Sequence, residues 1–341
     1  MAEVASHQGS SRSQGKVALI TGANTGIGKD VARQLAVSNA YRKVILACRN
    51  SAKAERARKD LETVTGKSVF EIIVMDLADA ASVRGALSSL SEPIDDLVMN
   101  AGGSGGKTPL ALTKDGVTQI FASNVLGHVI LLEELIRSDR LKRAAVFAGS
   151  EAARGIPKLG MKRPALTTSS ADEFASLCDG TYFRGRKADV TLAYGQVKYL
   201  GALWMAATAR RYPNLKLITM SPGNTSGTEG PRDLPLPLRL LVKYLLMPVV
   251  MPLFGMIQNL DQGAKRLVDA LGDPTLRSGV FYASKADALT GPVIDQSEIF
   301  PDLANESYQD NAREAVHRFT GEPSRSGVDA ASAVTSPTGV R

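Results

Sequence analysis

Seven short apolar runs, separated by segments long enough to form helices, limit the folds open to this 341-residue chain. Each run is nearly continuous rather than alternating with polar residues, which is typical of strands buried on both faces of a parallel sheet. The runs lie at 17–20, 44–47, 72–75, 97–99, 145–148, 217–220 and 280–282. We therefore predict a doubly wound α/β fold with about seven parallel strands and helices on both faces of the sheet.

The folded unit is expected to be a single domain from about residue 15 to residue 321. Residues 1–14 are polar and contain no apolar segment of a signal peptide, and residues 322–341 are rich in Ser, Ala, Thr, Gly and Pro. Both ends are predicted to be disordered. Within the domain, the segment at about 155–189 contains Pro157 and Pro164 and is expected to be an insertion that leaves the sheet.

A second distinctive segment, 234–257, is strongly apolar and has the sequence LPLPLRLLVKYLLMPVVMPLFGMI. Arg239, Lys243 and four prolines interrupt it, so a membrane span is not expected. We predict that the region at about 224–260 is an apolar lid over the substrate or a helix that contacts a membrane surface. A helix packed on the sheet would account for part of it. The protein is expected to be cytoplasmic, with peripheral membrane contact left open.

Charge, cysteine and histidine content indicate which partners and metal sites can be expected. The net charge is +7, but the basic clusters alternate with acidic residues and lack interleaved aromatics, which argues against a nucleic-acid partner. Cys48 and Cys178 form no paired motif, as is usual in a reducing compartment. The three histidines are scattered, so no metal site is predicted, and His128 is expected to pack against a helix.

The first apolar run ends in the glycine-rich sequence TGANTGIG at residues 21–28. Ile27, Val31 and Leu35 then recur at helical spacing, so a helix is expected to begin inside the glycine run. A strand, a glycine turn and a helix N-terminus in this order direct backbone N–H groups at a pyrophosphate. We predict a dinucleotide site, rather than a merely structural turn, formed by Gly22, Asn24, Thr25, Gly26, Ile27 and Gly28.

The position about 20 residues after the glycine turn indicates which dinucleotide is bound. NAD sites usually carry an acidic residue there, which bonds the ribose 2′-hydroxyl. In this chain the position is Cys48, followed by Arg49, so no carboxylate repels a 2′-phosphate and a guanidinium is ready to pair with one. We predict NADP(H) as cofactor; an ordinary strand-end charge is the alternative for Arg49.

A predicted helix at 191–211 carries Tyr194 and Lys198, four residues apart and therefore on one face. An ammonium beside a phenol stabilises the phenolate, so Lys198 is expected to lower the pKa of Tyr194 towards the working range of an acid–base catalyst. Taken alone, the pair more often marks a solvated helix face than a catalytic site.

Further short motifs lie at the ends of the predicted strands or on the helices that follow them: Asp76-Leu77, Asn100-Ala101-Gly102, Asn124, Ser150 and Pro222-Gly223. Together with the glycine turn and the Tyr194–Lys198 pair, they resemble in order and position the motifs of the short-chain dehydrogenase/reductase family, whose members have a Rossmann fold. The resemblance covers nearly the whole folded part.

The resemblance implies a role for each motif. Tyr194 would be the general acid or base, Ser150 would hydrogen-bond the substrate oxygen, and Asn124 would hold a water that relays the proton. Lys198 would hold the nicotinamide ribose as well as tune the tyrosine. The cofactor would also be contacted by Asp76, Leu77, Asn100, Ala101, Gly102, Pro222 and Gly223.

Two branches of the family share features with this chain. The stretches GANTGIGK and ILACRN resemble retinol-dehydrogenase-type enzymes. The long insertion and much of the C-terminal half are similar to light-dependent protochlorophyllide reductases. Those enzymes carry a cysteine two residues after the active-site lysine, where this chain has Leu200.

The expected function is an NADP(H)-dependent oxidoreductase that acts on a bulky apolar carbonyl or alcohol, such as a retinoid-, steroid- or lipid-like molecule. The alternatives are a reductase of a carbon–carbon double bond in a pigment-like ring and a non-catalytic NADP(H)-binding sensor. The protein is expected to be a monomer or a homodimer, because family members often pair through the tyrosine helix and the insertion could cover that surface.

Overall fold

The computed structural model describes residues 15–157, 160–186, 189–225 and 257–321. The two ends predicted to be disordered lie outside the described residues, as does nearly all of the apolar segment 234–257. The lid and membrane-contact hypotheses for that segment therefore stay predictions.

The seven predicted strands form one mostly parallel sheet, with an eighth strand at its edge, in the order β3-β2-β1-β4-β5-β6-β7-β8. The strands are β1 (Lys16–Thr21), β2 (Tyr41–Cys48), β3 (Phe70–Val74), β4 (Ile94–Met99), β5 (Leu141–Ala148), β6 (Lys216–Met220), β7 (Phe281–Ser284) and β8 (Val293–Asp295). Only the β7–β8 pair is antiparallel among these strands. The order reverses between β1 and β4, where doubly wound sheets bind ligands.

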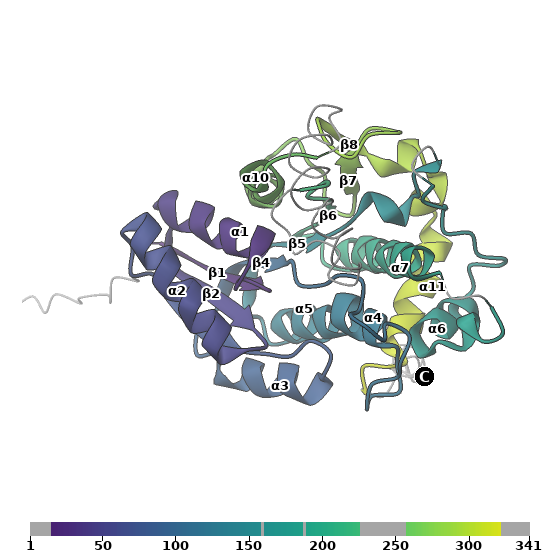
Figure 1. Ribbon diagram of the computed structural model, residues 1–341, viewed down its shortest axis with the longest axis horizontal. Coiled ribbons are helices and arrows are strands. Elements are labelled where there is room, and N and C mark those ends of the chain that lie inside the picture. Colours follow the sequence, from purple (N-terminus) through teal and green to yellow (C-terminus); the bar gives the residue numbers. More distant parts are fainter. Residues whose placement is uncertain (1–14, 158–159, 187–188, 226–256, 322–341) are drawn as a thin grey trace, which may run out of the picture.

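Helices cover both faces of the sheet, as predicted (Figure 1). One face carries α1 (Gly26–Val37), α2 (Ser51–Thr65) and α10 (Leu260–Gly272). The other carries α3 (Ala80–Ser89), α5 (Gly127–Arg137) and α7 (Val190–Arg211), the last being the helix predicted at 191–211. The short α4 (Gln119–Phe121) is joined to α5 by a π-helical turn, η1 (Ala122–Leu126).

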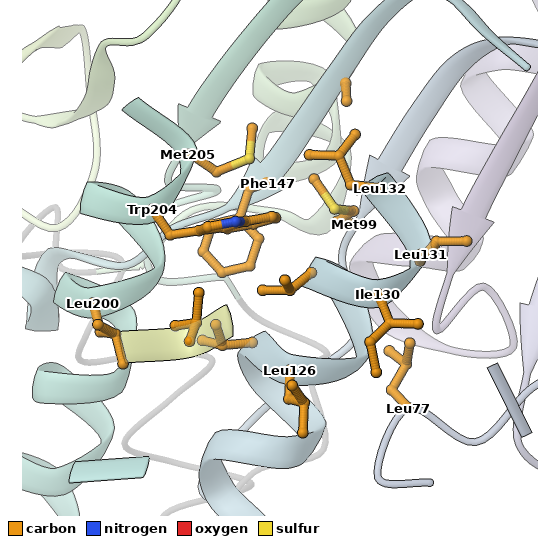
Figure 2. Close-up of a cluster of buried hydrophobic side chains, with 14 of the residues drawn as sticks. Leu77, Met99, Leu126, Ile130, Leu131, Leu132, Phe147, Leu200, Trp204 and Met205 are labelled. Atoms are coloured by element: carbon orange, nitrogen blue, oxygen red, sulfur yellow. The ribbon is translucent and has the colours of Figure 1, made fainter. Parts of the chain in front are cut away.

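Helix α7 runs through the core rather than along the surface. All residues from 195 to 209 are buried, because α6 (Ala171–Asp179) and α11 (Glu306–His317) pack against it as well as the sheet does. On one side the Trp204 indole meets the Phe147 ring of β5 edge-on, with centroids 6.0 Å apart (Figure 2). On another side Tyr199 stacks on Phe300 at 5.2 Å. The predicted insertion therefore supplies a helix, α6, that covers α7.

The apolar helix that leads from α4 through η1 to α5 is part of this core. By length and composition Gln119–Arg137 could cross a membrane, but 72% of its apolar window is buried inside the protein. Figure 2 shows Leu126, Ile130 and Leu132 of this helix within the apolar cluster beside α7. Burial on this scale is that of a core helix of a globular domain.

Candidate active site

The motif residues predicted from the sequence meet along the edge of the sheet where the parallel strands end. The glycine turn follows β1, Asn100 follows β4, Ser150 follows β5 and Pro222 follows β6. Since β4 lies between β1 and β5, the turn and the serine are two strands apart along one edge. Tyr194 and Lys198 reach the same edge from α7.

The glycine turn has the shape that a phosphate site requires. Gly22 and Gly26 adopt φ of 68° and 55°, and α1 begins at Gly26. The Thr25 side chain makes no capping hydrogen bond, which leaves the N-terminal N–H groups of α1 to a ligand. A Cβ at Gly28 would lie 2.5 Å from the Gly22 carbonyl oxygen, so only glycine permits this close approach.

An open hollow of about 380 Å³ lies beside this turn. It is lined by Asn24, Thr25 and Gly26 from the turn, by Lys29 and Arg33 from α1, and by Leu61 from α2, among others. The close backbone packing at Gly28 fits a dinucleotide phosphate. The cations at the hollow are already paired with carboxylates, Lys29 with Asp60 and Arg33 with Asp30 and Asp261.

Arg49 lies just beyond β2 and is exposed. Within the described residues the structure records no ion pair for its guanidinium, whereas the nearby Arg58 is paired with Glu55 and Glu62. Cys48, which precedes it, is buried and accepts hydrogen bonds from the Ala23 and Asn24 N–H groups, and burial raises the pKa of its thiol to about 11. The thiol thus supports the glycine turn, while Arg49 remains available to an anion.

The Asn100-Ala101-Gly102 motif fixes the end of β4 against the end of β1. The Asn100 side chain donates to the Thr21 carbonyl oxygen (3.1 Å), and the Ala101 N–H donates to the Thr21 hydroxyl (3.0 Å). Gly102 has φ of 150°, and a Cβ there would lie 2.4 Å from Oδ1 of Asn124. This packing leaves no room for a side chain at residue 102.

The Asp76-Leu77 motif follows β3 and turns the chain into α3. The Asp76 carboxylate accepts from the Ala78 N–H (3.0 Å), and its own N–H donates to the Ser82 hydroxyl (3.0 Å). Leu77 is buried against Gly127, where a Cβ would lie 2.3 Å from the Leu77 carbonyl oxygen. The motif is therefore held rigidly at the rim where the resemblance puts the adenine.

Asn124 lies at the centre of the π-helical turn, and its side chain is wholly buried. Its amide nitrogen donates to the carbonyl oxygens of Gly103 and Ile120 (both 2.8 Å), and its oxygen accepts from the Gly103 N–H (3.0 Å). The amide thus clamps the loop after β4. A water held by Asn124, the predicted role, would have to use the remaining lone pairs of its oxygens.

His128 and Thr21 complete this part of the site, and the sequence analysis gave neither a functional role. The His128 Nδ1 donates to the Asn124 carbonyl oxygen (3.0 Å), so its Nε2 accepts from the Thr21 hydroxyl (2.9 Å). Burial lowers the pKa of His128 to about 3, which keeps the imidazole neutral. The only signal was their proximity to the motif residues Gly22 and Asn124 along the chain.

The catalytic candidates meet where β5 ends. Ser150 is half-buried, and its hydroxyl accepts from the Ala152 N–H (3.2 Å). A hydrogen bond with Ser150 acts to lower the pKa of the Tyr194 phenol. The Lys198 ammonium donates to the Ala148 carbonyl oxygen (2.8 Å) and lies 5.7 Å from the centre of the Tyr194 ring.

The prediction that Lys198 lowers the pKa of Tyr194 is wrong for this structure. Burial of the phenol raises its pKa, the Ser150 hydrogen bond opposes that shift only in part, and the Glu151 carboxylate adds to it. Burial also lowers the pKa of Lys198 to about 7, so its own positive charge is disfavoured. Tyr194 is therefore held as a neutral phenol, the form that can donate a proton.

The Pro222-Gly223 step follows β6 and closes the other side of the site. Gly223 has φ of 71°, and its N–H donates to the Ser221 hydroxyl (3.0 Å). The Pro222 carbonyl oxygen accepts from the side chain of Gln258 (2.6 Å). Leu200, by contrast, is fully buried in the apolar core (Figure 2), so residue 200 does not line the site.

A family model described as short chain dehydrogenase matches residues 16–159. Retinol dehydrogenase 11 of Mus musculus is 41% identical over 134 residues, which are 38% of this chain and 40% of that protein. The WW domain-containing oxidoreductase of Gallus gallus is 39% identical over 140 residues, 39% of this chain and 33% of that protein. The chain thus matches less than half the length of these curated relatives.

Solved structures share the fold over most of the chain. A protein of Mycobacterium Paratuberculosis has a TM-score of 0.64 at 24% identity, covering 89% of this chain and 93% of its own. A short chain dehydrogenase from Burkholderia cenocepacia in complex with NADP has a TM-score of 0.55 at 21% identity, covering 82% and 99%. An NADPH-bound carbonyl reductase from chicken fatty liver has a TM-score of 0.52 at 18% identity, covering 79% and 96%.

Proposed function

Because the chain belongs to the short-chain dehydrogenase/reductase family, in its retinol dehydrogenase branch, we propose that it is an NADP(H)-dependent oxidoreductase acting on a bulky apolar carbonyl or alcohol. One observation carries the proposal. Ser150, Tyr194 and Lys198 meet at the carboxyl end of β5, on the same sheet edge as a glycine turn with the geometry of a phosphate site.

The residues of the chain divide the work of the reaction. The nicotinamide, when bound, gives or takes the hydride. Tyr194 donates a proton to the carbonyl oxygen in the reduction, or accepts it from the alcohol in the oxidation. The Ser150 hydroxyl donates a hydrogen bond to the same oxygen and so stabilises its developing negative charge. Tyr194 is protonated at neutral pH, as a tyrosine of ordinary pKa also is, and burial extends this form to higher pH; the reduction needs this form.

The cofactor would bind at the glycine turn and at the loops that follow β2, β3, β4 and β6. The N-terminal N–H groups of α1 would hold the pyrophosphate, and Arg49 would pair with a 2′-phosphate. Asp76, Leu77 and the Asn100-Ala101-Gly102 loop would contact the adenosine side, while Lys198 and Pro222-Gly223 would hold the nicotinamide side. The guanidinium of Arg49 is exposed and has no ion pair with any residue that the structure describes, which supports NADP(H) over NAD(H).

The apolar substrate class rests on two supports of a different kind. Several relatives are named retinol dehydrogenases, which implies a long apolar substrate for those proteins. The segment 234–257, although outside the described residues, has the apolar composition expected of a cover for such a molecule.

The proposal is tested by following NADPH absorbance with a series of aldehydes, ketones and quinones of increasing apolar size. We expect kcat/KM to rise with apolar bulk and to be higher with NADPH than with NADH. Preference for small polar carbonyls would contradict the substrate class, and preference for NADH would contradict the cofactor.

A further inference from the structure

Glu151, the residue after Ser150, is a buried carboxylate to which the proposed reaction assigns no role. Glu151 is the first residue of the 3₁₀ turn η2 (Glu151–Ala153) and is 3% exposed. A carboxylate is rarely buried to this extent unless hydrogen bonds or opposite charges compensate for lost hydration. The partners of Glu151 therefore indicate why it is there.

Those partners come from the two strands beyond β5. The Ser221 hydroxyl, one residue after β6, donates to Oε2 of Glu151 (2.7 Å). The N–H of Ser284, the last residue of β7, donates to Oε1 (3.2 Å). One carboxylate thus ties together the carboxyl ends of β5, β6 and β7.

The tie continues to the step proposed to hold the nicotinamide. The Ser221 hydroxyl that donates to Glu151 also accepts from the Gly223 N–H (3.0 Å). Arg266 of α10 donates to the Ser221 carbonyl oxygen (3.3 Å) and to the Ser284 hydroxyl (3.2 Å), with Nη1 3.9 Å from Oε1 of Glu151. A Cβ at Gly223 would lie 2.6 Å from Nη1 of Arg266, so the step packs directly on this cluster.

Among the described residues the cation recorded against Glu151 is Arg266, whose Nη1 lies 3.9 Å from Oε1, beyond hydrogen-bond distance. Arg154, on the same turn, directs its guanidinium to the Gly155 and Lys285 carbonyl oxygens and to the Gln296 side chain instead. Lys198, from α7, donates to the Ala148 carbonyl oxygen. The Glu151 charge therefore still acts on Tyr194, where it raises the pKa of the phenol.

Resting on the proposed function, we propose that Glu151 is a positioning residue of the hydride-transfer site: it holds the Pro222-Gly223 step in register with Ser150 and Tyr194, and it places a negative charge on the residue next to Ser150. The geometric part follows from the hydrogen bonds through Ser221 to Gly223. The electrostatic part keeps Tyr194 protonated to higher pH and so favours reduction over oxidation.

The substitution Glu151→Gln separates charge from shape. Glutamine has nearly the same volume, and its oxygen and amide can still hydrogen-bond Ser284 and Ser221, but it carries no charge. Removing the negative charge makes the phenolate easier to form, so the pKa of Tyr194 falls. The alkaline limb of kcat/KM for carbonyl reduction should move to lower pH, and in alcohol oxidation the rise of activity with pH should begin earlier.

The substitution Ser221→Ala tests the geometric part. It removes the hydroxyl that joins Glu151 to Gly223 and leaves the charge in place, so NADPH should bind about fivefold to tenfold more weakly, as for one lost hydrogen bond. The ionisation of Tyr194 should not move. Glu133→Gln is the matched control, because Glu133 of α5 accepts a hydrogen bond from Trp204 and pairs with His317 of α11, away from the catalytic edge. It should change neither quantity.

Tyrosinate absorbance makes the test independent of turnover. The difference between a protein and its Tyr194→Phe partner gives the ionisation of Tyr194, measured in the wild-type and Glu151→Gln backgrounds. A lower midpoint in Glu151→Gln supports the inference, and an unchanged midpoint overturns its electrostatic part. Unchanged NADPH affinity in Ser221→Ala overturns its geometric part. A wild-type protein without activity on any carbonyl would contradict the proposed function alone, since neither readout depends on turnover.

Discussion

Burial of Lys198 in the site lowers the stability of the folded protein. The ammonium is buried, it donates a hydrogen bond to the Ala148 carbonyl oxygen, and burial lowers its pKa to about 7. In the unfolded chain a lysine has a pKa of about 10.4. Between these two values the unfolded state binds the proton and the folded state does not, so stability rises with pH in that window and is lowest below pH 7.

We therefore predict that Lys198→Met is more stable than the wild type near pH 7 although it is inactive. Methionine fills a similar volume without a charge to desolvate, and the lost hydrogen bond to Ala148 does not vary with pH. The stability difference should shrink as pH rises from about 7 to about 10, by at most about 1.4 kcal/mol per pH unit. Urea unfolding at several pH values measures it. Lys142→Met, at a half-exposed lysine paired with Asp139, should show no such trend.

A difference that stays constant across this pH range would mean that the lysine is charged and well solvated in the folded protein. That result would contradict the burial described here.

The proposed preference for NADP(H) depends on Arg49. If its guanidinium pairs with the 2′-phosphate, Arg49→Ala should weaken NADPH binding about tenfold to a hundredfold, as for a lost charge-assisted pair. The affinity for NADH, which lacks this phosphate, should hardly change. Quenching of protein fluorescence or equilibrium dialysis gives both constants. Arg56→Ala removes another exposed arginine seven residues further on and should affect neither. Equal losses for both cofactors would exclude a phosphate-specific role.

At the scale of the elements, the π-helical turn η1 is the feature that joins the fold to the site. It places Asn124 where its amide makes three hydrogen bonds, two of them to Gly103 in the loop after β4. The backbone carbonyl of the same residue accepts from His128, which in turn accepts from Thr21 beneath the glycine turn. Asn124 thus connects the helix both to the loop after β4 and, through His128, to Thr21 beneath the glycine turn. π-turns often mark functional sites in this way.

We predict that Asn124→Ala lowers the free energy of unfolding by about 2–4 kcal/mol, because it leaves buried backbone groups of the loop without partners. NADPH binding should weaken as well, because the loop would lose its anchor. Chemical denaturation and a cofactor titration measure the two effects. Asn311 of α11 donates one half-buried hydrogen bond to the Ser169 carbonyl oxygen. Asn311→Ala should lower stability less than Asn124→Ala and leave cofactor binding unchanged.

The sequence predicted the seven main strands because each is buried on both faces and is therefore a continuous apolar run. It missed β8, which has three residues, all half-buried, so it lacks that signature. It predicted the insertion but not α6 within it. The glycine turn and Tyr194 were predictable because each chemistry needs particular residues at a particular spacing. The His128–Thr21 link and the Glu151–Ser221 link join residues 107 and 70 positions apart, and no local pattern reports such contacts.

The direction of the Tyr194 pKa shift was predicted wrongly for a related reason. The spacing of Tyr194 and Lys198 gives their neighbourhood on the helix but not their burial. In the structure burial is the largest cause of both pKa shifts: it raises the pKa of Tyr194 and lowers that of Lys198.

At the scale of the whole molecule, α6 and α11 cover α7. Their contacts include Tyr199 of α7 with Phe174 of α6, and Arg210 of α7 with Asp310 of α11 (2.6 Å). A second copy of the chain would have to displace both helices to reach α7. We therefore expect a monomer, which light scattering coupled to size-exclusion chromatography would report as a mass near 36.2 kDa. A dimer that persists on dilution would show that another face pairs.

Tyr194 is proposed to donate the proton in an NADPH-linked reduction. The most direct test compares wild type and Tyr194→Phe with NADPH and the best substrate of the carbonyl series, measuring kcat together with the Kd of NADPH. Phenylalanine keeps the ring and removes only the acid, so kcat should fall about 10²–10⁴-fold while the Kd of NADPH changes little. A variant that retains wild-type kcat would contradict the account.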